Sequence, residues 1–440
     1  MNNELSTLRL WRTLTLASLG GALEFYDFVI FVFFTGVIAN LFFPPGIPTW
    51  SRQLQTYALL AAGYFARPLG GIVMAHFGDT KGRKKIFTLS ILMMAAPTFL
   101  IALLPTYAEA GLVSPLLLLL LRLLQGAAIG GEAPAAWVFV SEHARKGMYG
   151  LAVGVLTGGL SLGILLGSVI ATSLSVFFTP EQLSQGIWRA PFAVGGVFGF
   201  IAALLRRWLP ETPVFLAMRA QIETAKTQPL RMVLTSHRGA VAKSIVSTLS
   251  LTAGIVVTIL MTPSLLHQLF HVPTKAAQIA GLFGTAALCL ATVFIGWASD
   301  RFGLRLVAAI SVPFFVLSNY ALYFAARNGT QHLAVWYFVA GLGAGCTVLT
   351  PIVILQLFPT PVRFTGFALG YNVAYAVFGG VAPLIVASLS TFTSLAAPHY
   401  VAVASVLGLI VSLERLRKRG SELQGNHSSA PINPDRTLEA

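Results

Sequence analysis

Charged residues are scarce in this sequence: Asp, Glu, Lys and Arg together make up 10% of its 440 residues. Soluble domains carry about 25% charged residues, so an ordinary soluble globular chain is excluded. Hydrophobic residues reach 56%, and the mean hydropathy is +0.77. Apolar runs recur along the whole chain, and about 18 such residues or more are enough to cross a bilayer as a helix. We therefore predict an all-α membrane protein that crosses the bilayer many times.

Cysteine is rare as well. Cys289 and Cys346 are the only two, and both lie in apolar segments without metal-ligand spacing. We interpret them as packing residues; a disulfide is the open alternative. The phosphate-binding pattern G-x-x-x-x-G-K-[ST] is missing, which excludes an ATP-driven pump. Because no nucleophile–base or metal constellation occurs either, we expect no enzyme activity, no cofactor and no metal site.

Acidic residues are half as numerous as basic ones, which gives a formal net charge of +14. Of the 29 Lys and Arg residues, 23 fall in the N-terminus, the C-terminus and the connections on the same side, and four fall on the opposite side. Cytoplasmic loops of membrane proteins carry this excess, so both termini are predicted to be cytoplasmic. The basic charge therefore reports orientation and contact with the lipid bilayer, and no nucleic acid partner is expected.

Twelve apolar segments are long enough to span the membrane. The longest hydrophilic connection follows the sixth segment and divides the chain near its middle. We expect an N-terminal six-helix half at 1–208, a cytoplasmic connection at 209–242, a C-terminal six-helix half at 243–414 and a disordered cytoplasmic tail at 415–440. The expected spans are 14–43, 54–76, 86–105, 113–140, 149–174, 189–208, 243–266, 276–298, 306–326, 332–357, 364–390 and 396–413.

An internal repeat supports this division. The connection AHFGDTKGRKK after the second span matches GWASDRFGLR after the eighth, so that Asp79 corresponds to Asp300 and Gly82 to Gly303 at an offset of 221 residues. Two halves related by such a repeat place the substrate site between them. In each connection the Gly permits an unusual backbone angle, and the Asp can bridge to a neighbouring helix end.

Two carboxylates interrupt the first span. Glu24 and Asp27 are three residues apart, which puts them on one helix face, and an ionised carboxylate at this depth costs at least a few kcal/mol. At about 1.5 Å per residue, they lie about 15 and 20 Å into the membrane, and Arg122 of the fourth span lies about 16 Å above the inner surface. The three side chains are therefore expected at the same level.

Six stretches together resemble one family. The chain is similar to the metabolite:proton symporters of the major facilitator superfamily, which transport proline/betaine, α-ketoglutarate, shikimate or citrate. Ala75 and Leu304 depart from the Gly and Arg usual in the two connection motifs. The stretches are LEFYDF, RPLGGIVMAHFGDTKGRKK, RLLQGAAIGGEAPAAWVFVSEHA, WRAPFAVGG, RRWLPETPVF and FPTPVRFTGFALGYNVAYAVFGG.

The resemblance implies that the first and fourth spans are neighbours lining a central cavity. It also implies that Asp27 carries the proton, with Glu24 and Arg122 as coupling partners. Arg122 favours the ionised form of a neighbouring carboxyl, whereas removal from water disfavours it, so a cavity that opens alternately can load and release a proton. A permanent ion pair that only fixes helix packing is the open alternative.

Other polar side chains in the spans are candidate substrate contacts. Arg67 faces either the cavity, as an anion contact, or Glu132. Aromatic residues in membrane spans also serve packing and interfacial roles, which stay open for the tyrosines. The candidates for substrate binding are Arg67, Arg122, Tyr26, Tyr57, Tyr371, Asn372 and Tyr375. The candidates for a cytoplasmic gate are Asp79, Gly82, Arg83, Glu132, Asp300 and Arg363.

These observations indicate a proton-coupled symporter that imports a small polar metabolite, an organic acid or zwitterion, by rocking of its two halves. The expected partners are the small-molecule substrate, protons and the lipid bilayer, and the chain is expected to work as a monomer. The expected location is the bacterial inner membrane. A proton-driven efflux or exchange carrier of the same fold is the alternative. A membrane sensor is less compatible, because neither the central connection nor the tail is large enough for a soluble domain.

Overall fold

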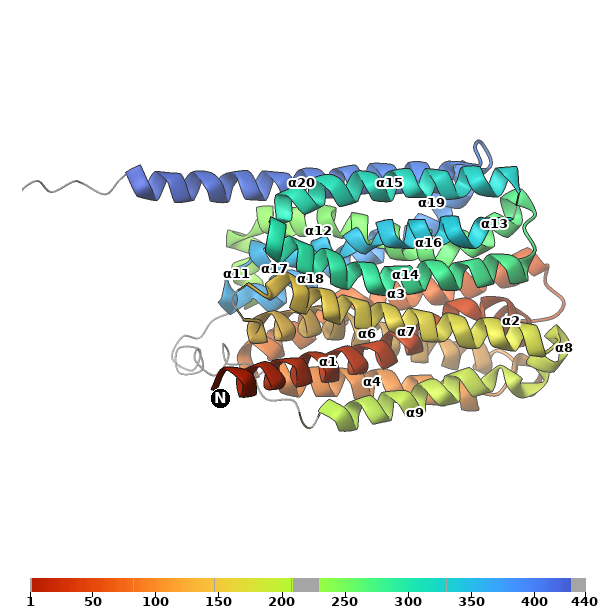
Figure 1. Ribbon diagram of the computed structural model, residues 1–440. Coiled ribbons are helices and arrows are strands. Elements are labelled where there is room, and N and C mark those ends of the chain that lie inside the picture. Colours follow the sequence, from red (N-terminus) through yellow and green to blue (C-terminus); the bar gives the residue numbers. More distant parts are fainter. Residues whose placement is uncertain are drawn as a thin grey trace, which may run out of the picture.

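The computed structural model of this chain describes residues 2–81, 83–145, 147–206, 208, 229–329 and 331–428, with the backbone alone at 2–9, 78–81, 83–85, 87, 206 and 415–428. Within these ranges the elements are helices, and no strand occurs. The long helices lie side by side in one bundle. Helix α1 (Asn2–Phe33) begins at the end of the bundle at which α20 (Ala396–Ser428) stops (Figure 1). We call this the terminal end and the opposite one the far end.

All helices of the first half precede those of the second half along the chain. The first half continues with α2 (Thr35–Leu41), α3 (Thr49–Lys81), α4 (Arg83–Leu103), α5 (Tyr107–Ala110), α6 (Val113–His143), α7 (Tyr149–Phe177), α8 (Pro180–Gln182), η1 (Leu183–Ile187) and α9 (Arg189–Arg206). The second half comprises α11 (Pro229–Ser236), α12 (Arg238–Thr252), η2 (Ala253–Met261), α13 (Thr262–Phe270), α14 (Thr274–Phe302), α15 (Leu304–Asn328), α16 (Leu333–Ala344), η3 (Gly345–Val348), α17 (Leu349–Leu357), η4 (Thr360–Val362), α18 (Arg363–Ala374), η5 (Tyr375–Gly379), α19 (Gly380–Ser390) and α20.

Ten helices of the described chain are long and apolar enough to cross a membrane. An eleventh span is a pair of helices, Pro180–Ile187 and Arg189–Leu205, bent by 49°. The apolar part of α4, Thr88–Leu103, is shorter and completes the twelve spans expected from the sequence. The chain is thus an all-α, multi-pass membrane protein, as predicted.

Several boundaries differ from the expected ones, because hydropathy detects the apolar part of a helix and not its polar ends. The first segment, expected at 14–43, divides into α1 and α2. The C-terminal half, expected from residue 243, already begins with α12, and the connection before it contains α11. The tail expected from residue 415 starts as a continuation of α20 to Ser428. Residues 209–228 and 429–440 lie outside the described part of the chain.

The turn between α14 and α15 shows why its motif needs a glycine. Gly303 has φ +83°, a backbone angle that side chains with a Cβ rarely adopt. It ends α14 and starts α15, and so reverses the chain within one residue. The equivalent residue of the first connection, Gly82, lies outside the described residues.

The two halves meet along two pairs of helices, α7 with α14 and α3 with α18. Glycines make the first contact close. A Cβ on Gly154 would lie 2.7 Å from the Thr292 carbonyl oxygen, and one on Gly150 would overlap the Gly296 carbonyl oxygen. Small residues of this kind let helices approach closely in membranes. Cys289 lies on the same face of α14, and neither it nor Cys346 is in a disulfide, in agreement with the packing interpretation.

Candidate functional site

Helices α3 and α6 approach closely in the first half, and this contact places two buried arginines next to each other. A Cβ on Gly126 would overlap the Gly63 carbonyl oxygen, and one on Gly130 would overlap the Arg67 carbonyl oxygen. The Arg122 side chain then lies over Gly63, with its Nη2 3.2 Å from a Cβ built there. The glycines of α6 therefore bring Arg67 and Arg122 to the same side of the α3–α6 pair.

Arg67 reaches across to the second half of the protein. Its Nε donates a 3.4 Å hydrogen bond to Asn372 Oδ1, and Asn372 Nδ2 donates a 2.6 Å bond to the Gly130 carbonyl. Arg67 is 2% exposed, and its Nη2 has no hydrogen-bond partner in the described structure. Arg67 thus contacts Asn372 of α18 and makes no ion pair with Glu132 among the described residues.

Aromatic rings surround the Arg67 guanidinium group. Its Cζ lies 4.1 Å from the ring centroid of Tyr375, 5.4 Å from that of Tyr371, 5.8 Å from that of Tyr64 and 5.9 Å from that of Phe28. Tyr371 and Tyr375 come from α18 and the π-helical segment η5, and the Tyr64 and Tyr375 rings stack. A cation within about 6 Å of such rings is stabilised electrostatically. The rings replace part of the hydration that Arg67 has lost.

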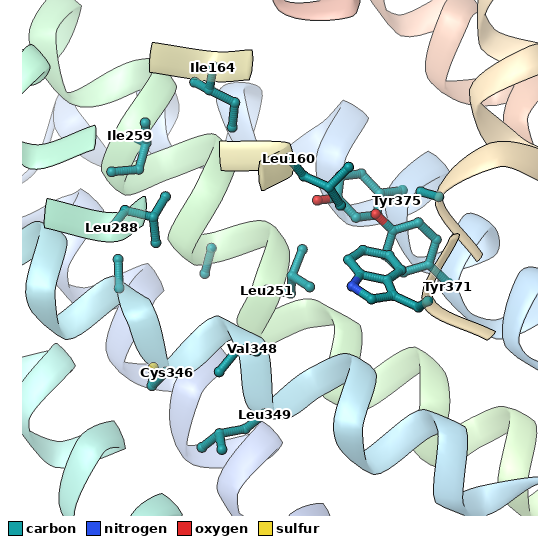
Figure 2. Packing of buried hydrophobic residues seen from close by; sticks show 14 of the residues in the cluster. Leu160, Ile164, Leu251, Ile259, Leu288, Cys346, Val348, Leu349, Tyr371 and Tyr375 are labelled. Atoms are coloured by element: carbon teal, nitrogen blue, oxygen red, sulfur yellow. The ribbon is translucent and has the colours of Figure 1, made fainter. Parts of the chain in front are cut away.

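Apolar side chains from both halves pack around these tyrosines. Figure 2 shows Tyr371 and Tyr375 together with Leu160 of α7 and Leu251 of α12. All four are buried in one core cluster. The candidate site therefore lies beside an apolar cluster between the halves.

Arg122 is the second buried cation. Its Cζ lies 4.2 Å from the ring centroid of Phe31 and 5.0 Å from that of Phe28. Its Nη1 donates a 3.0 Å hydrogen bond to Gln125 Oε1, whereas Nε and Nη2 have no partner in the described structure. Since the Phe28 ring lies near both guanidinium groups, the two arginines belong to one site.

Asp27 is fully buried, and its position differs from the one expected. Its carboxyl packs against α9, because a Cβ on Gly199 would lie 3.2 Å from Asp27 Oδ2 and one on Gly195 would touch Asp27 Oδ1. Neither oxygen accepts a hydrogen bond from another described residue, and no ion pair joins Asp27 to Arg122. The sequence predicted a shared level for the two residues, whereas the rotation of α1 that turns Asp27 toward α9 depends on helix packing, which hydropathy does not report.

Two polar residues that sequence reasoning did not single out lie between Asp27 and Arg122. Gln125 Nε2 donates a 2.7 Å hydrogen bond to Thr98 Oγ1, and the Thr98 hydroxyl donates a 2.9 Å bond to the Met94 carbonyl. Thr98 Cγ2 and Asp27 Oδ1 both face Gly195. Gln125 follows Arg122 by three residues in an apolar span, and this was the available signal for its role.

The remaining candidates from α1 and α3 do not all lie in the same place. Glu24 is buried in α1. The Tyr26 hydroxyl donates a 2.9 Å hydrogen bond to the Pro191 carbonyl, which directs Tyr26 toward α9. Tyr57 is 50% exposed and lies outside the central cluster. Tyr26 and Tyr57 thus do not join the two arginines.

Contacts join the two halves at the terminal end of the bundle. Asp300 Oδ1 and Oδ2 accept hydrogen bonds of 2.7 and 2.8 Å from the backbone N–H groups of Gly150 and Leu151, at the first turn of α7. Arg363 Nη1 of α18 lies 3.8 Å from Glu142 Oε1 of α6. An aspartate at a helix N-terminus satisfies unpaired N–H groups and complements the helix dipole. Each half thus binds the other at this end.

The structure describes the other gate candidates only in part. Glu132 is buried in the first half, where it accepts a hydrogen bond from the Ser90 hydroxyl. The side chains of Asp79 and Arg83, and the whole of Gly82, lie outside the described residues. Among the residues that the structure describes, no group of three or more His, Cys, Asp or Glu side chains is arranged to hold a metal ion.

Comparison with known proteins adds to this geometry. The sequence model of the sugar (and other) transporter family matches residues 13–262. The chain is 29% identical to the citrate-proton symporter of Klebsiella pneumoniae, over 92% of this chain and 91% of the relative. It is 28% identical to the proline/betaine transporter of Salmonella typhimurium, over 95% of this chain and 85% of the relative.

A solved structure has the same fold. The proton:xylose symporter XylE of the major facilitator superfamily, bound to 6-bromo-6-deoxy-D-glucose, superposes with a TM-score of 0.77 at 15% sequence identity. The match covers 94% of this chain and 96% of the other. The twelve-helix arrangement of that superfamily is therefore the fold found here.

Proposed function

The chain belongs to the sugar (and other) transporter family of the major facilitator superfamily, and on this premise we propose that it is a proton-coupled symporter. It imports a small polar metabolite that carries a carboxylate, an organic acid or a zwitterion, by rocker-switch alternating access. As a member of this family it is a transporter and not an enzyme.

The observation that carries the proton-coupling proposal is Asp27. A carboxylate buried without a hydrogen-bond donor is costly, whereas a protonated carboxyl is accommodated far more easily. Among the described residues, no donor binds either of its oxygen atoms. A group that holds a proton in one conformation and releases it when water reaches it is what a symporter requires.

The two arginines support a substrate with a carboxylate. Arg67 Nη2 and the Arg122 Nε and Nη2 are buried donors without a partner in the described structure, and so is the hydroxyl of Tyr371. Guanidinium groups bind carboxylates through paired, charge-assisted hydrogen bonds. The relatives named for citrate and for proline/betaine are proteins whose substrates carry such a group.

The gate proposal assigns the terminal end to the cytoplasm, because most basic residues lie there. Asp300 and Arg363 act with Glu132, Asp79, Gly82 and Arg83 to close it. The protein works as a monomer in the bacterial inner membrane. Its halves, 1–208 and 243–414, rock about the central site.

An uptake assay in proteoliposomes tests this function. Labelled citrate, α-ketoglutarate, shikimate, proline and betaine are supplied with the outside medium more acidic than the lumen. A symporter accumulates its substrate above the outside concentration, and collapse of the proton gradient abolishes the excess. Accumulation only under the opposite gradient establishes the alternative, a proton-driven exchange carrier. Uptake that ignores the gradient in both directions contradicts both.

A further inference from the structure

We propose that Gln125 and Thr98 connect Arg122 to Asp27, so that proton binding at Asp27 depends on what Arg122 holds. The two residues are positioning residues for the proton site. The proposal rests on the proposed symport and adds the path by which an anion and a proton influence each other.

The direction of each hydrogen bond in the connection is fixed. A guanidinium group only donates, so Arg122 Nη1 binds the oxygen of the Gln125 amide, at 3.0 Å. The amide nitrogen of Gln125 is thereby turned to Thr98 Oγ1, at 2.7 Å. All three side chains are fully buried, and removal from water strengthens such chains of hydrogen bonds. The positive charge of Arg122 thus orients the Gln125 amide dipole and, through it, the Thr98 hydroxyl dipole.

The Thr98 hydroxyl can take two orientations, which differ in the acceptor of its hydrogen. It has one hydrogen, which is directed to the Met94 carbonyl oxygen at 2.9 Å, and the geometry of the described residues gives the Asp27 oxygens no hydrogen bond within 3.5 Å. When Asp27 is protonated, it needs no donor and can itself donate to the second lone pair of Thr98 Oγ1. When Asp27 loses its proton to water, rotation of the Thr98 hydroxyl supplies a donor to the carboxylate. The only covalent bond that forms or breaks is the O–H bond of the Asp27 carboxyl, whose proton goes to or comes from water.

Among the described residues, no other group around Asp27 donates a hydrogen bond to it. Helix α9 contributes the backbone and Cα atoms of Gly195 and Gly199, which do not titrate. On α1, the Tyr26 hydroxyl donates to the Pro191 carbonyl, and Glu24 is a buried acid that offers no donor when it is ionised. Arg122, on α6, is therefore the cation that can act on Asp27, and it does so through Gln125.

This arrangement makes the substrate anion and the proton bind together. An anion at Arg122 offsets the positive charge that supports ionised Asp27, and so favours the protonated form. A proton on Asp27 in turn leaves Arg122 free to bind the anion, since coupling between two sites is reciprocal. Symport follows from this one relationship.

Infrared difference spectroscopy on the full chain in lipid nanodiscs tests the connection without a substrate. The carbonyl band of protonated Asp27, assigned by its loss in Asp27→Asn, is followed against pH. Thr98→Val removes the hydroxyl and should move the midpoint to higher pH by about one unit, a tenfold change in proton affinity. Thr98→Ser should restore the midpoint. Thr248→Val is the matched control, because the Thr248 hydroxyl is equally buried and donates to the carbonyl of Ser244, four residues earlier.

A double-mutant cycle tests the link to Arg122. Arg122→Met should raise the midpoint in the wild-type background and should have little further effect once Gln125→Leu is present, since the path is then already broken. Gln125→Met serves if Gln125→Leu does not fold.

Three results overturn the proposal: a midpoint in Thr98→Val equal to that in Thr248→Val, additive effects of Arg122→Met and Gln125→Leu, or no titrating band from Asp27. These outcomes are independent of transport. If uptake is driven by the gradient but the two substitutions have additive effects, the connection alone is rejected. If their effects are not additive but uptake ignores the gradient, symport alone is rejected.

Discussion

Asp300 of the second half accepts a 2.7 Å hydrogen bond from the backbone N–H of Gly150, at the start of α7 in the first half. The bond holds the two halves together at the terminal end, directly beside the close approach of Gly150 to Gly296. It must break whenever this end opens.

Asp300→Asn should weaken this closure. Loss of a charged cap at a helix N-terminus costs about 1 kcal/mol, which shifts a two-state equilibrium about fivefold. Spin labels at the terminal ends of α6 and α18 should therefore report a larger population with a long separation. Arg301→Gln, an exposed substitution in the same turn, is the control and should leave the distances unchanged. Identical distance distributions in Asp300→Asn and the wild type would show that the bond does not hold the gate.

The sequence allowed Asp300 to be singled out, because it belongs with Gly303 to a repeated motif with its own chemistry, and its role in a gate stays a prediction. The central site was predictable only in part. Hydropathy gives the depth of a residue in a helix, but the direction of its side chain depends on how that helix packs. The expected cluster of Asp27 with Arg122 therefore did not include the contact of the Asp27 carboxyl with α9. Thr98 and Gln125 were missed because the hydrogen bond between them joins α4 and α6, a contact that hydropathy and spacing do not report.

Arg122→Ala should reduce gradient-driven uptake at least tenfold, because no other side chain replaces two buried donors at that position. The amount of folded protein, measured by size-exclusion chromatography, should remain near that of the wild type. Arg327→Ala, an exposed change at the far end of α15, is the matched control. Loss of folded protein in Arg122→Ala alone would favour a purely structural role for this arginine.

Gly126→Ala should destabilise the protein, because the added Cβ would overlap the carbonyl oxygen of Gly63 and a backbone atom cannot move aside. Overpacking of this kind costs about 1–3 kcal/mol. Gly36→Ala is the matched control in α2, where no atom lies within 4 Å of the new Cβ. Thermal unfolding followed by intrinsic fluorescence should show a lower midpoint for Gly126→Ala only. Equal midpoints would mean that the α3–α6 contact is looser than described.

Glu109, in the connection between α4 and α6, provides a pH test outside the membrane spans. The backbone N–H of Thr106 donates to its carboxylate at 2.6 Å and holds the pKa of Glu109 below its usual range. A lowered pKa gives stability that is present at neutral pH and is lost as the pH falls through the folded-state value. Glu109→Gln should thus be less stable than the wild type at pH 7, with a difference that disappears in acid. Its uptake should keep the wild-type pH profile; a changed profile would place a titrating group of transport in this connection.

Proton movement itself tests the central claim, that Asp27 carries the proton inward with the substrate. A pH-sensitive dye inside proteoliposomes is followed after addition of the compound that is taken up. The wild type should acidify the lumen during uptake, whereas Asp27→Asn should exchange labelled for unlabelled substrate without any acidification. Undiminished acidification by Asp27→Asn, or a lumen that becomes alkaline in the wild type, would contradict the account.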